Sequence, residues 1–461
     1  MPNDEKPRSF EDGDARAKPE TPSAYTCTLC GCLCDDLSLV VAEDRVIEAV
    51  SACDLARPRL IGLRTTPLAT PSARIQGRDA DAEAVVEAAR ILVGAKAPAI
   101  IGLGRSTNET ARKAVALADR IGATIEVGDA TSAWPRIAAM QRVGSIGATL
   151  GEVKNRADVV VFWASDPVTT HPRHLERYSV EPTGRFVPEG RGGRRVAVVD
   201  ATTTPTARLA DVFLQVRPEV ELNVLLVLRA LVRETALDAK RVEHATGCSL
   251  AALQAFAEML QGARYGAWFT GAFAGRGPIA EVEARHQAVT GLVRDLNRTT
   301  RFAALGLGEA GNAHGAESAL AWQSGFAPGV DFGAGFPESL PGESSAAVRL
   351  RRGDFDCAIV VGGSAIDSMP GDARARLADR PWIFLGDREH EAFDLATIAL
   401  PATTPGIDES GTFTRVDGVT LPIRSLRPAS SPSEGDWLVA LKEAVERLTS
   451  ESAAPEGEAG S

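Results

Sequence analysis

Residues 26–53 of this chain read TCTLCGCLCDDLSLVVAEDRVIEAVSAC and hold five of its seven cysteines. The five are Cys27, Cys30, Cys32, Cys34 and Cys53. The spacing of the first, second and fourth lets three thiolates converge on one metal centre, and closely spaced ligands close their loops at low entropic cost. Thiolates are the usual ligands of 4Fe–4S clusters. The stretch therefore favours an iron–sulfur centre near the start of the chain.

Other uses of these cysteines remain open. A disulfide framework is typical of small secreted domains, whereas this chain has 461 residues and no recognisable signal peptide. Zinc is a stronger alternative, although four-cysteine zinc sites usually use two CxxC pairs and Cys53 has no such partner. A site that has lost its metal is the third alternative. Cys32 is the odd thiol, because alternation in a turn predicts that it points away from Cys30 and Cys34.

The composition is that of an ordinary acidic globular protein. Charged residues make up 24%, hydrophobic residues 44%, and the net charge is −11 at pH 7. The negative charge makes nucleic acid and anionic membranes poor partners, and no apolar stretch is long enough to span a bilayer. Residues 1–24 and 449–461 are polar and mixed in charge, so we expect disordered tails. These features predict a cytoplasmic protein, with Cys248 and Cys357 as buried spectators.

The body of the chain alternates strand and helix patterns. Apolar, mostly continuous runs predict strands buried on both faces, as in a parallel sheet. They are residues 97–103, 159–163, 196–199, 265–269, 302–305, 358–361, 382–385 and 396–400. Between them, Asn108–Gly122 and Glu221–Arg233 read as helices, the first with Thr107 or Asn108 as N-cap. The order predicts an α/β fold whose ligand crevices lie at strand carboxyl ends.

Several of the predicted strands end in polar or glycine-rich turns. Gly102 and Gly104 follow one strand, and Gly362 and Gly363 follow another. Such turns at one sheet edge suit phosphates, because backbone N–H groups and helix N-termini point there. Asp166 and Asp200 each stand at or just past the end of a buried strand, where an acidic residue often receives nucleotide hydroxyls. A helix N-cap is an equal alternative for each. Together the turns favour a large phosphate-bearing cofactor, or a fold descended from one that held it.

Four other residues are weaker candidates. His171 and His174 form the densest histidine site, but two histidines without a third ligand are weak evidence for a metal. Arg276 lies in a glycine-flanked turn and could contact an anion. His314 lies in residues 308–326, GEAGNAHGAESALAWQSGF, which we interpret as a loop at a site or interface. Residues 401–418 predict a turn followed by a short hairpin.

A family resemblance covers roughly residues 25–445. It is carried by CTLCGCLCDD with Cys53, SDPVTTHPRHLERYS (165–179), VVDATTTPTARLADVFLQVRP (198–218), GNAHGAESALAWQSGFAPGVDF (311–332) and PGIDESGTFTRVDG (405–418). In this order the stretches resemble the B subunit of formylmethanofuran dehydrogenase and that of its bacterial relative, the formyltransferase/hydrolase complex. The resemblance implies a molybdopterin-oxidoreductase fold.

The resemblance also implies cofactors. In catalytic members, a 4Fe–4S cluster feeds a tungsten or molybdenum bis-pterin guanine dinucleotide centre. That centre reduces carbon dioxide to formate, which a partner subunit joins to methanofuran. The cluster ligands correspond to Cys27, Cys30, Cys34 and Cys53. The turns at Asp166, Asp200 and the glycines 362 and 363 fall where the wider superfamily holds pterin dinucleotides.

One departure argues against that chemistry here. Catalytic members carry a cysteine or selenocysteine metal ligand, then a histidine, in the turn after the first strand. The ligand would fall at or beside Asn108 and Glu109, and no Cys or His occurs between residues 54 and 170. A carboxylate does not replace the soft thiolate that tunes such a centre. The pterin-contact pattern is also eroded, because Ala201 and Thr202 stand where an arginine is expected and residues 218–221 read PEVE instead of P-G-T-D.

We therefore expect a B subunit that is a scaffold without redox catalysis. The resemblance implies tetrahydromethanopterin-linked oxidation of formaldehyde to formate, with companion subunits of the A, C and D types. An active tungsten or molybdenum subunit is the alternative, and a nucleotide-binding regulatory α/β protein is a third. Beyond the tails, the expected divisions are a 4Fe–4S-type β subdomain at 25–65, α/β lobes at 66–215 and 216–395, and a closing segment at 396–448.

Overall fold

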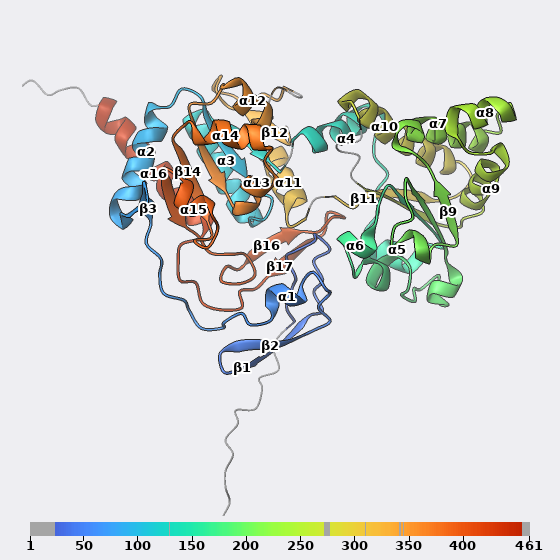
Figure 1. Ribbon diagram of the computed structural model, residues 1–461, viewed down its shortest axis with the longest axis horizontal. Helices are drawn as coiled ribbons and strands as arrows, with labels where there is room; N and C mark the ends of the chain where they lie inside the picture. The colour runs from blue at the N-terminus through green and yellow to red at the C-terminus, as the bar shows by residue number, and fades with distance from the viewer. Residues whose placement is uncertain are drawn as a thin grey trace, which may run out of the picture.

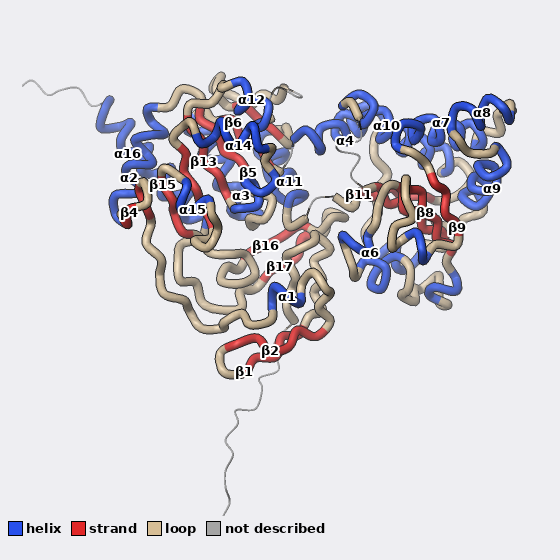
Figure 2. The backbone as a smooth tube through the Cα atoms, in the orientation of Figure 1, coloured by secondary structure: helices blue, strands red, loops and turns tan. Residues whose placement is uncertain are grey.

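The computed structural model describes residues 24–128, 130–271, 277–308, 310–340, 343 and 345–453. Its strands form two α/β lobes that lie side by side (Figure 1). Helices surround the strands of both lobes, and long loops connect them to the N-terminal segment (Figure 2). No helix within these ranges is both long and apolar enough to cross a membrane.

The larger lobe is built on an eight-stranded sheet. Its order is β12-β6-β5-β13-β14-β15-β3-β4, and the run from β6 to β15 is parallel. The strands are β3 (Arg74–Ile75), β4 (Arg78–Asp79), β5 (Pro98–Gly102), β6 (Thr124–Val127), β12 (Gly329–Asp331), β13 (Cys357–Val361), β14 (Trp382–Gly386) and β15 (Ile398–Pro401). The parallel strands are almost wholly buried, which explains why they read as continuous apolar runs.

Helices cover both faces of this sheet. One face packs against α2 (Asp81–Gly94), α3 (Asn108–Ile121), α11 (Ala313–Ser324) and α16 (Glu434–Ala453). The other packs against α12 (Ala346–Arg352), α13 (Gly363–Ser368), α14 (Gly371–Ala378) and α15 (Ala392–Leu395). Helix α16 continues to Ala453, past the start of the tail expected at residue 449.

The smaller lobe contains a fully parallel five-stranded sheet in the order β11-β10-β7-β8-β9. The strands are β7 (Val159–Trp163), β8 (Arg195–Asp200), β9 (Val212–Gln215), β10 (Gly266–Thr270) and β11 (Phe302–Gly306). One face packs against α7 (Glu221–Val232), α8 (Ala239–Thr246), α9 (Leu250–Gln261) and α10 (Ile279–Leu296). The other packs against α5 (Leu150–Arg156) and the π-helix η1 (Leu175–Ser179). Four short helices complete it: α6 (Pro167–Thr170), η2 (Gly190–Gly193), η3 (Ala207–Leu209) and η4 (Pro218–Val220).

The N-terminal segment joins the smaller lobe. It contains the antiparallel hairpin of β1 (Ser38–Ala42) and β2 (Arg45–Val50), followed by α1 (Arg57–Leu60). Its buried side chains, including Cys27, Cys32 and Cys34, share one apolar cluster with the β7, β8 and β10 face. A second hairpin, β16 (Gly411–Thr414) and β17 (Thr420–Ile423), packs on the cysteine segment through Leu33. The cysteine segment thus lies between the smaller lobe and this second hairpin.

The sheets divide the chain differently from the expected boundary at residues 215 and 216. Strands of the larger sheet come from residues 74–127 and again from 329–401, and the smaller lobe is inserted between them. The helix α4 (Ala130–Val143) leads out of the larger lobe, and α11 leads back into it. Periodicity alone could not reveal this, because it identifies strands without saying which strands pair.

The eight apolar runs all form strands, and the hairpin predicted in residues 401–418 corresponds to β16 and β17. The interpretation of residues 308–326 as a loop is wrong, because most of the stretch is α11. Its glycines suggested a turn, yet Gly315 lies inside the helix. Glycine costs a helix about 1 kcal/mol relative to alanine, and buried Ala316, Ala319 and Leu320 offset that cost by packing in the core. The apolar runs also missed β3, β4, β6, β9 and β12.

Candidate functional site

The turn after β5 is shaped by a close approach to β13. Gly102 pairs with Val361, and a Cβ on Gly102 would lie 2.1 Å from the Val361 carbonyl oxygen. Gly102 also has a φ of +117°, which disfavours any other residue. Helix α3 then begins at Asn108, with the Thr107 hydroxyl accepting a hydrogen bond from the Thr110 amide. Of the two caps that the sequence allows, Thr107 and Asn108, Thr107 is the one that caps the helix.

Asn108 occupies a closed hydrogen-bond network. Its side-chain nitrogen donates to the hydroxyls of Thr412 and Thr414, each at 3.1 Å. Its side-chain oxygen accepts from Asn312, whose nitrogen also donates to the Ser106 carbonyl at 2.8 Å. The Thr414 amide donates back to the Asn312 oxygen at 2.7 Å. We call Asn108, Asn312, Thr412 and Thr414 the asparagine seam; it joins α3, α11 and β16.

Glu109 is held by the same hairpin. Its carboxylate accepts from the Thr412 amide at 3.0 Å and from the Thr412 hydroxyl at 2.7 Å. The pKa of Glu109 is lowered overall, because these hydrogen bonds outweigh the opposing effect of burial. Both of its oxygens therefore already have protein donors.

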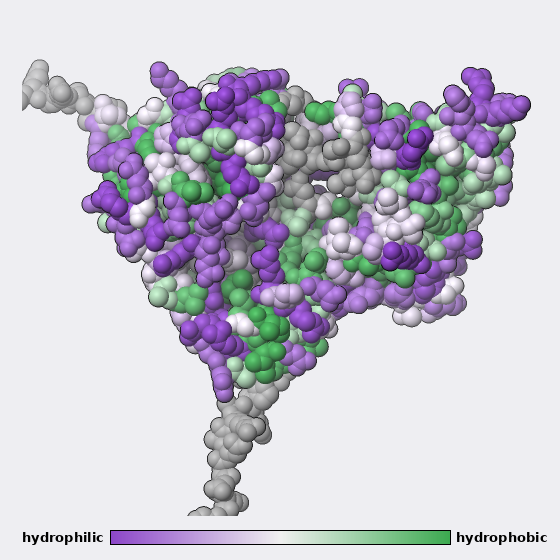
Figure 3. Space-filling view, viewed as in Figure 1, coloured by the Kyte–Doolittle hydropathy of each residue, from purple (hydrophilic) through white to green (hydrophobic). Residues whose placement is uncertain are grey.

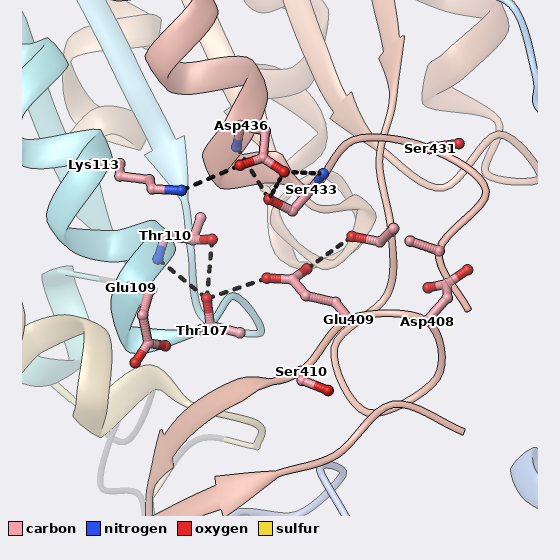
Figure 4. A pocket seen from close by; sticks show the side chains of 12 residues that line it. Thr107, Glu109, Thr110, Lys113, Asp408, Glu409, Ser410, Ser431, Ser433 and Asp436 are labelled. Atoms are coloured by element: carbon pink, nitrogen blue, oxygen red, sulfur yellow. Dashed lines mark hydrogen bonds and ion pairs between the residues drawn. The ribbon is translucent and has the colours of Figure 1, made fainter. Parts of the chain in front are cut away.

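A pocket of about 290 Å³ opens beside this turn (Figure 4). Glu409 reaches toward Thr107 in it, at 3.3 Å, and also accepts from Thr403 at 3.0 Å. Burial raises the pKa of Glu409 to about 7, with Asp436 and Asp408 adding to the effect and the threonine hydroxyls opposing it. The pocket is lined by hydroxyls and carboxylates, with Lys113 as its cation.

Glu434 lies next to this pocket, at the start of α16. The Ser106 hydroxyl donates to its carboxyl group at 2.5 Å. Burial raises the pKa of Glu434 to about 8; the Ser106 bond lowers it and the charge of Glu409 raises it. Sequence reasoning missed Glu409 and Glu434, because nothing near residue 434 in the chain indicates that it packs against residue 106.

These residues do not fit a pterin-bound tungsten or molybdenum centre. The resemblance predicts its thiolate ligand at or beside Asn108 and Glu109, and the side-chain polar atoms of both residues are bonded to the protein's own groups. A soft metal prefers a thiolate to amide or carboxylate oxygens. A metal here would have to displace a buried network without gaining a suitable ligand.

The predicted nucleotide turns are divided between the two sheets. Gly362 and Gly363 follow β13 in the larger lobe, with Gly362 at a φ of +79°. In the smaller lobe, Asp166 follows β7 and Asp200 is the last residue of β8. Asp166 accepts hydrogen bonds from the Thr206 amide at 3.0 Å and the Thr169 hydroxyl at 2.5 Å. Asp166 therefore has internal partners, and it stands at the N-cap position of α6 without capping it.

The four predicted cluster cysteines lie close together as free thiols. The Cys27 amide donates to the Cys34 carbonyl at 2.9 Å, which closes the loop between them. The pKa of Cys27 is raised to about 12, mainly by burial and in smaller part by the nearby Cys30, Cys34 and Cys53. In the described part of the chain, no three His, Cys, Asp or Glu side chains are set at the positions of ligands to a single metal ion.

The donor chemistry nevertheless fits a four-iron cluster. In a four-iron cluster each thiolate binds a different iron atom. The four thiols therefore need to surround a common cavity, and they need not converge on a single metal ion. Burial is the main cause of the raised pKa of Cys27, and the neighbouring thiols add to it. A bound cationic centre stabilises thiolates against both effects. The ligand assignment itself stays a prediction.

Cys32 differs from its expectation. Its thiol is buried and forms a hydrogen bond with Cys30, which lowers the pKa of Cys30 to about 7 and raises that of Cys32. The turn therefore directs Cys32 toward Cys30 instead of away from it. Gly31 and Leu33, both with positive φ, produce this turn.

The two histidines near Asp166 are buried. His174 is fully buried against Phe162 and Phe269, and burial lowers its pKa to about 3. Burial likewise lowers the pKa of His171 to about 4. His314 lies on α11 with a lowered pKa, again because of burial. Arg276 lies outside the described residues. The histidines are thus neutral, partly or wholly core side chains.

Comparisons with known proteins identify the family. No family model matches the chain. The B subunit of the tungsten-containing formylmethanofuran dehydrogenase 2 from Methanocaldococcus jannaschii is 33% identical over 417 residues, which cover 89% of this chain and 94% of that protein. This chain belongs to the formylmethanofuran dehydrogenase B-subunit family. The corresponding protein of Methanococcus maripaludis is 32% identical, over 87% of this chain and 92% of that protein.

Other members of this family and fold are more distant. The B subunit of the formyltransferase/hydrolase complex Fhc from Methylorubrum extorquens is 26% identical over 79% of this chain and 94% of that protein. The crystal structure of that FhcABCD complex with methylofuran matches with a TM-score of 0.67, covering 82% of this chain and 100% of the other, at 24% identity. Acetylene hydratase from Pelobacter acetylenicus matches with a TM-score of 0.60 and 11% identity, over 92% and 69%. The fold is therefore molybdopterin-oxidoreductase-like.

Proposed function

We propose that this homologue of the formylmethanofuran dehydrogenase B subunit is a scaffold without redox catalysis. Its place would be a formyltransferase/hydrolase-type complex that carries formaldehyde carbon to formate in tetrahydromethanopterin-linked one-carbon metabolism. Companion subunits of the A, C and D types would perform formyl transfer and hydrolysis, in the cytoplasm.

The asparagine seam is the observation that carries this proposal. A redox centre of the family type needs a soft ligand in the turn after β5, and this chain has a buried amide there, fully engaged with Asn312, Thr412 and Thr414. The bonds tie the turn to α11 and β16. An arrangement of this kind suits a structural joint, because every polar group gains a partner when the chain folds.

The surface supports a role within a larger complex. Figure 3 shows an apolar patch over the N-terminal hairpin. The exposed apolar side chains of the N-terminal segment include Ile47, Val50, Leu55 and Ile61, between 41% and 56% exposed. Larger contiguous apolar patches on a soluble protein commonly mark protein–protein contacts. A companion protein of the complex would bury this patch.

We further propose that residues 25–65 form a subdomain that holds a 4Fe–4S cluster through Cys27, Cys30, Cys34 and Cys53. Because no tungsten or molybdenum centre would exchange electrons with it, this cluster has a structural role and does not transfer electrons. The turns at Asp166, Asp200, Gly362 and Gly363 are then remnants of pterin-dinucleotide turns.

An active tungsten or molybdenum subunit is the second candidate. The two more similar relatives, at 33% and 32% identity, are named as parts of tungsten-containing enzymes. In that case the metal would be held without a thiolate from the turn after β5, and the protein would interconvert carbon dioxide and formate.

Metal analysis of the anaerobically purified complex separates the two candidates. The scaffold proposal expects iron, no tungsten or molybdenum, and no reduction of a viologen dye by formate. Deleting this chain should destabilise the transferase and hydrolase subunits. Near-stoichiometric tungsten or molybdenum together with formate-dependent dye reduction would instead establish the redox enzyme.

A further inference from the structure

Two neighbouring residues, Gly311 and Asn312, connect residues 27–34, which we call the cysteine loop, to the turn after β5. The Gly311 amide donates to the Leu29 carbonyl, directly before Cys30, at 2.8 Å. The next amide along the chain, that of Asn312, donates to the Gly104 carbonyl in the turn after β5 at 2.7 Å. One dipeptide at the start of α11 therefore joins the cysteine loop to the larger lobe.

The fit around this dipeptide is close. Gly311 has a φ of +80°, a backbone conformation that favours glycine. A Cβ on Gly311 would lie 2.6 Å from the Gly104 carbonyl oxygen and 2.9 Å from Cγ of Arg105. Asn312 is fully buried, and its side chain belongs to the asparagine seam. The dipeptide therefore has little room to move unless the cysteine loop or the turn after β5 moves with it.

A second connection runs through the end of β16. The Thr414 amide donates to the side-chain oxygen of Asn312 at 2.7 Å. Two residues later, the Val416 amide donates to the Gly31 carbonyl of the cysteine loop at 3.2 Å. Leu33 of the same loop packs in the small apolar cluster of the second hairpin. The asparagine seam and the cysteine loop are therefore connected through two separate segments of the chain.

The cysteine loop is also attached to the smaller lobe. The hydroxyl of Tyr178, in η1, donates to the Cys32 carbonyl at 3.4 Å. Cys27, Cys32 and Cys34 belong to the apolar cluster that covers one face of the smaller sheet. The loop thus has three carbonyl groups, at residues 29, 31 and 32, that accept from the start of α11, the second hairpin and η1. Its backbone holds three parts of the fold together.

We propose that loading of the cysteine loop with its 4Fe–4S cluster controls how firmly the two lobes are joined. This inference rests on the proposed cluster. A bound cluster favours the folded conformation of the loop, in which the three carbonyl groups keep their donors. Coupling between two equilibria is reciprocal, so the cluster stabilises those bonds by the same free energy by which they stabilise the cluster. The iron-free chain then has a looser joint between its lobes, and iron loading produces the rigid form that suits a scaffold.

The test compares hydrogen exchange in iron-loaded and iron-free full-length chain. Iron loading should slow amide exchange in peptides that contain residues 311–312 and 414–416, although neither segment supplies a predicted ligand. Helix α9, which packs on the opposite face of the smaller sheet, is the control and should exchange equally in both forms. Exchange in the two segments that does not change with iron would overturn the proposal.

Gly311→Ala tests the same connection from the other side. The added methyl group cannot fit against the Gly104 carbonyl, so the variant should hold iron about tenfold more weakly against a competing chelator. Gly308→Ala is the matched control, because nothing lies within 4 Å of the added atom, and it should hold iron like the parent chain. Parent-like iron affinity of Gly311→Ala would also overturn the proposal. The exchange comparison needs no variant, so it decides the question even if Gly311→Ala does not fold.

The outcomes separate this inference from the proposals before it. A parent chain that takes up no iron contradicts the proposed cluster itself, and this inference with it. A chain that holds its cluster but shows the same exchange with and without iron contradicts this inference alone. Tungsten, molybdenum and dye assays report on the scaffold role and do not depend on either result.

Discussion

The side-chain amide of Asn312 donates a hydrogen bond of 3.0 Å to the side-chain oxygen of Asn108. The two residues lie 204 positions apart, at the starts of α11 and α3. The contact joins the turn after β5 to α11, at the residue where the family resemblance predicts the metal ligand of a redox member.

Removing Asn312 should destabilise the protein strongly. Asn312→Ala leaves the Thr414 amide, the Ser106 carbonyl and the Asn108 oxygen without this partner. Asn312 is fully buried, so we expect a loss of about 3 kcal/mol in the free energy of unfolding. Chemical denaturation of the full chain measures this. Gln323→Ala, on the exposed side of the same helix, should change it by less than about 0.5 kcal/mol. If both substitutions changed the free energy of unfolding equally, the asparagine seam would make no contribution to stability.

Gly315 should tolerate no larger side chain. A Cβ at this position would lie 2.2 Å from the side-chain oxygens of both Asn108 and Asn312. Although alanine is the better helix former, Gly315→Ala should cost about 1–3 kcal/mol through overpacking. Gly308→Ala is the control, because nothing lies within 4 Å of the added atom. Thermal unfolding compares the two variants, and a stabilised Gly315→Ala protein would contradict the close approach of α11 to α3.

Stability should fall as the pH rises, because of Glu434. Its pKa is 4.5 when unperturbed and about 8 in the folded protein, where burial favours the neutral acid. The stability that Glu434 contributes is therefore fully present below about pH 4.5 and lost as the pH rises through about 8. Denaturation midpoints measured between about pH 6 and 9 should decline in the parent protein.

Glu434→Gln should flatten that pH profile, since the amide keeps the shape of the neutral acid. Glu443→Gln, an exposed position on the same helix, should leave the slope unchanged. Part of the slope will persist in Glu434→Gln, because burial also raises the pKa of Glu409 to about 7. An unchanged slope in Glu434→Gln would place the titrating group elsewhere.

The cysteine loop should bind iron. Full-length chain reconstituted anaerobically is expected to hold about four iron atoms, and Cys34→Ser should lose the visible absorption and most of the iron. Cys248→Ser should keep both, since Cys248 is buried in the core on the opposite face of the smaller sheet. A chain that takes up one zinc ion instead, with no iron, would favour the mononuclear alternative.

The local patterns of the chain were informative about elements. Continuous apolar runs identified eight strands, and Thr107 was recognisable as a helix cap because capping depends on residues three positions away. The glycine-rich residues 308–326 led to a wrong prediction of a loop. Gly315 is required there by the close approach of Asn108, and it does not form a turn. Glu409 and Glu434 gave no signal, since their burial depends on Thr107, Thr403 and Ser106 from distant parts of the chain.

The cysteine spacing, the strand periodicity and the missing ligand in the turn after β5 are properties of the sequence alone. They were sufficient for the α/β class, the family and the doubt about redox chemistry, because each depends on residues that are close in the chain. Only the tertiary structure decided that the larger sheet is interrupted by the smaller lobe and that Asn108 is locked by Asn312, Thr412 and Thr414. Those outcomes depend on which distant surfaces pack together, and on buried polar groups finding partners hundreds of residues away.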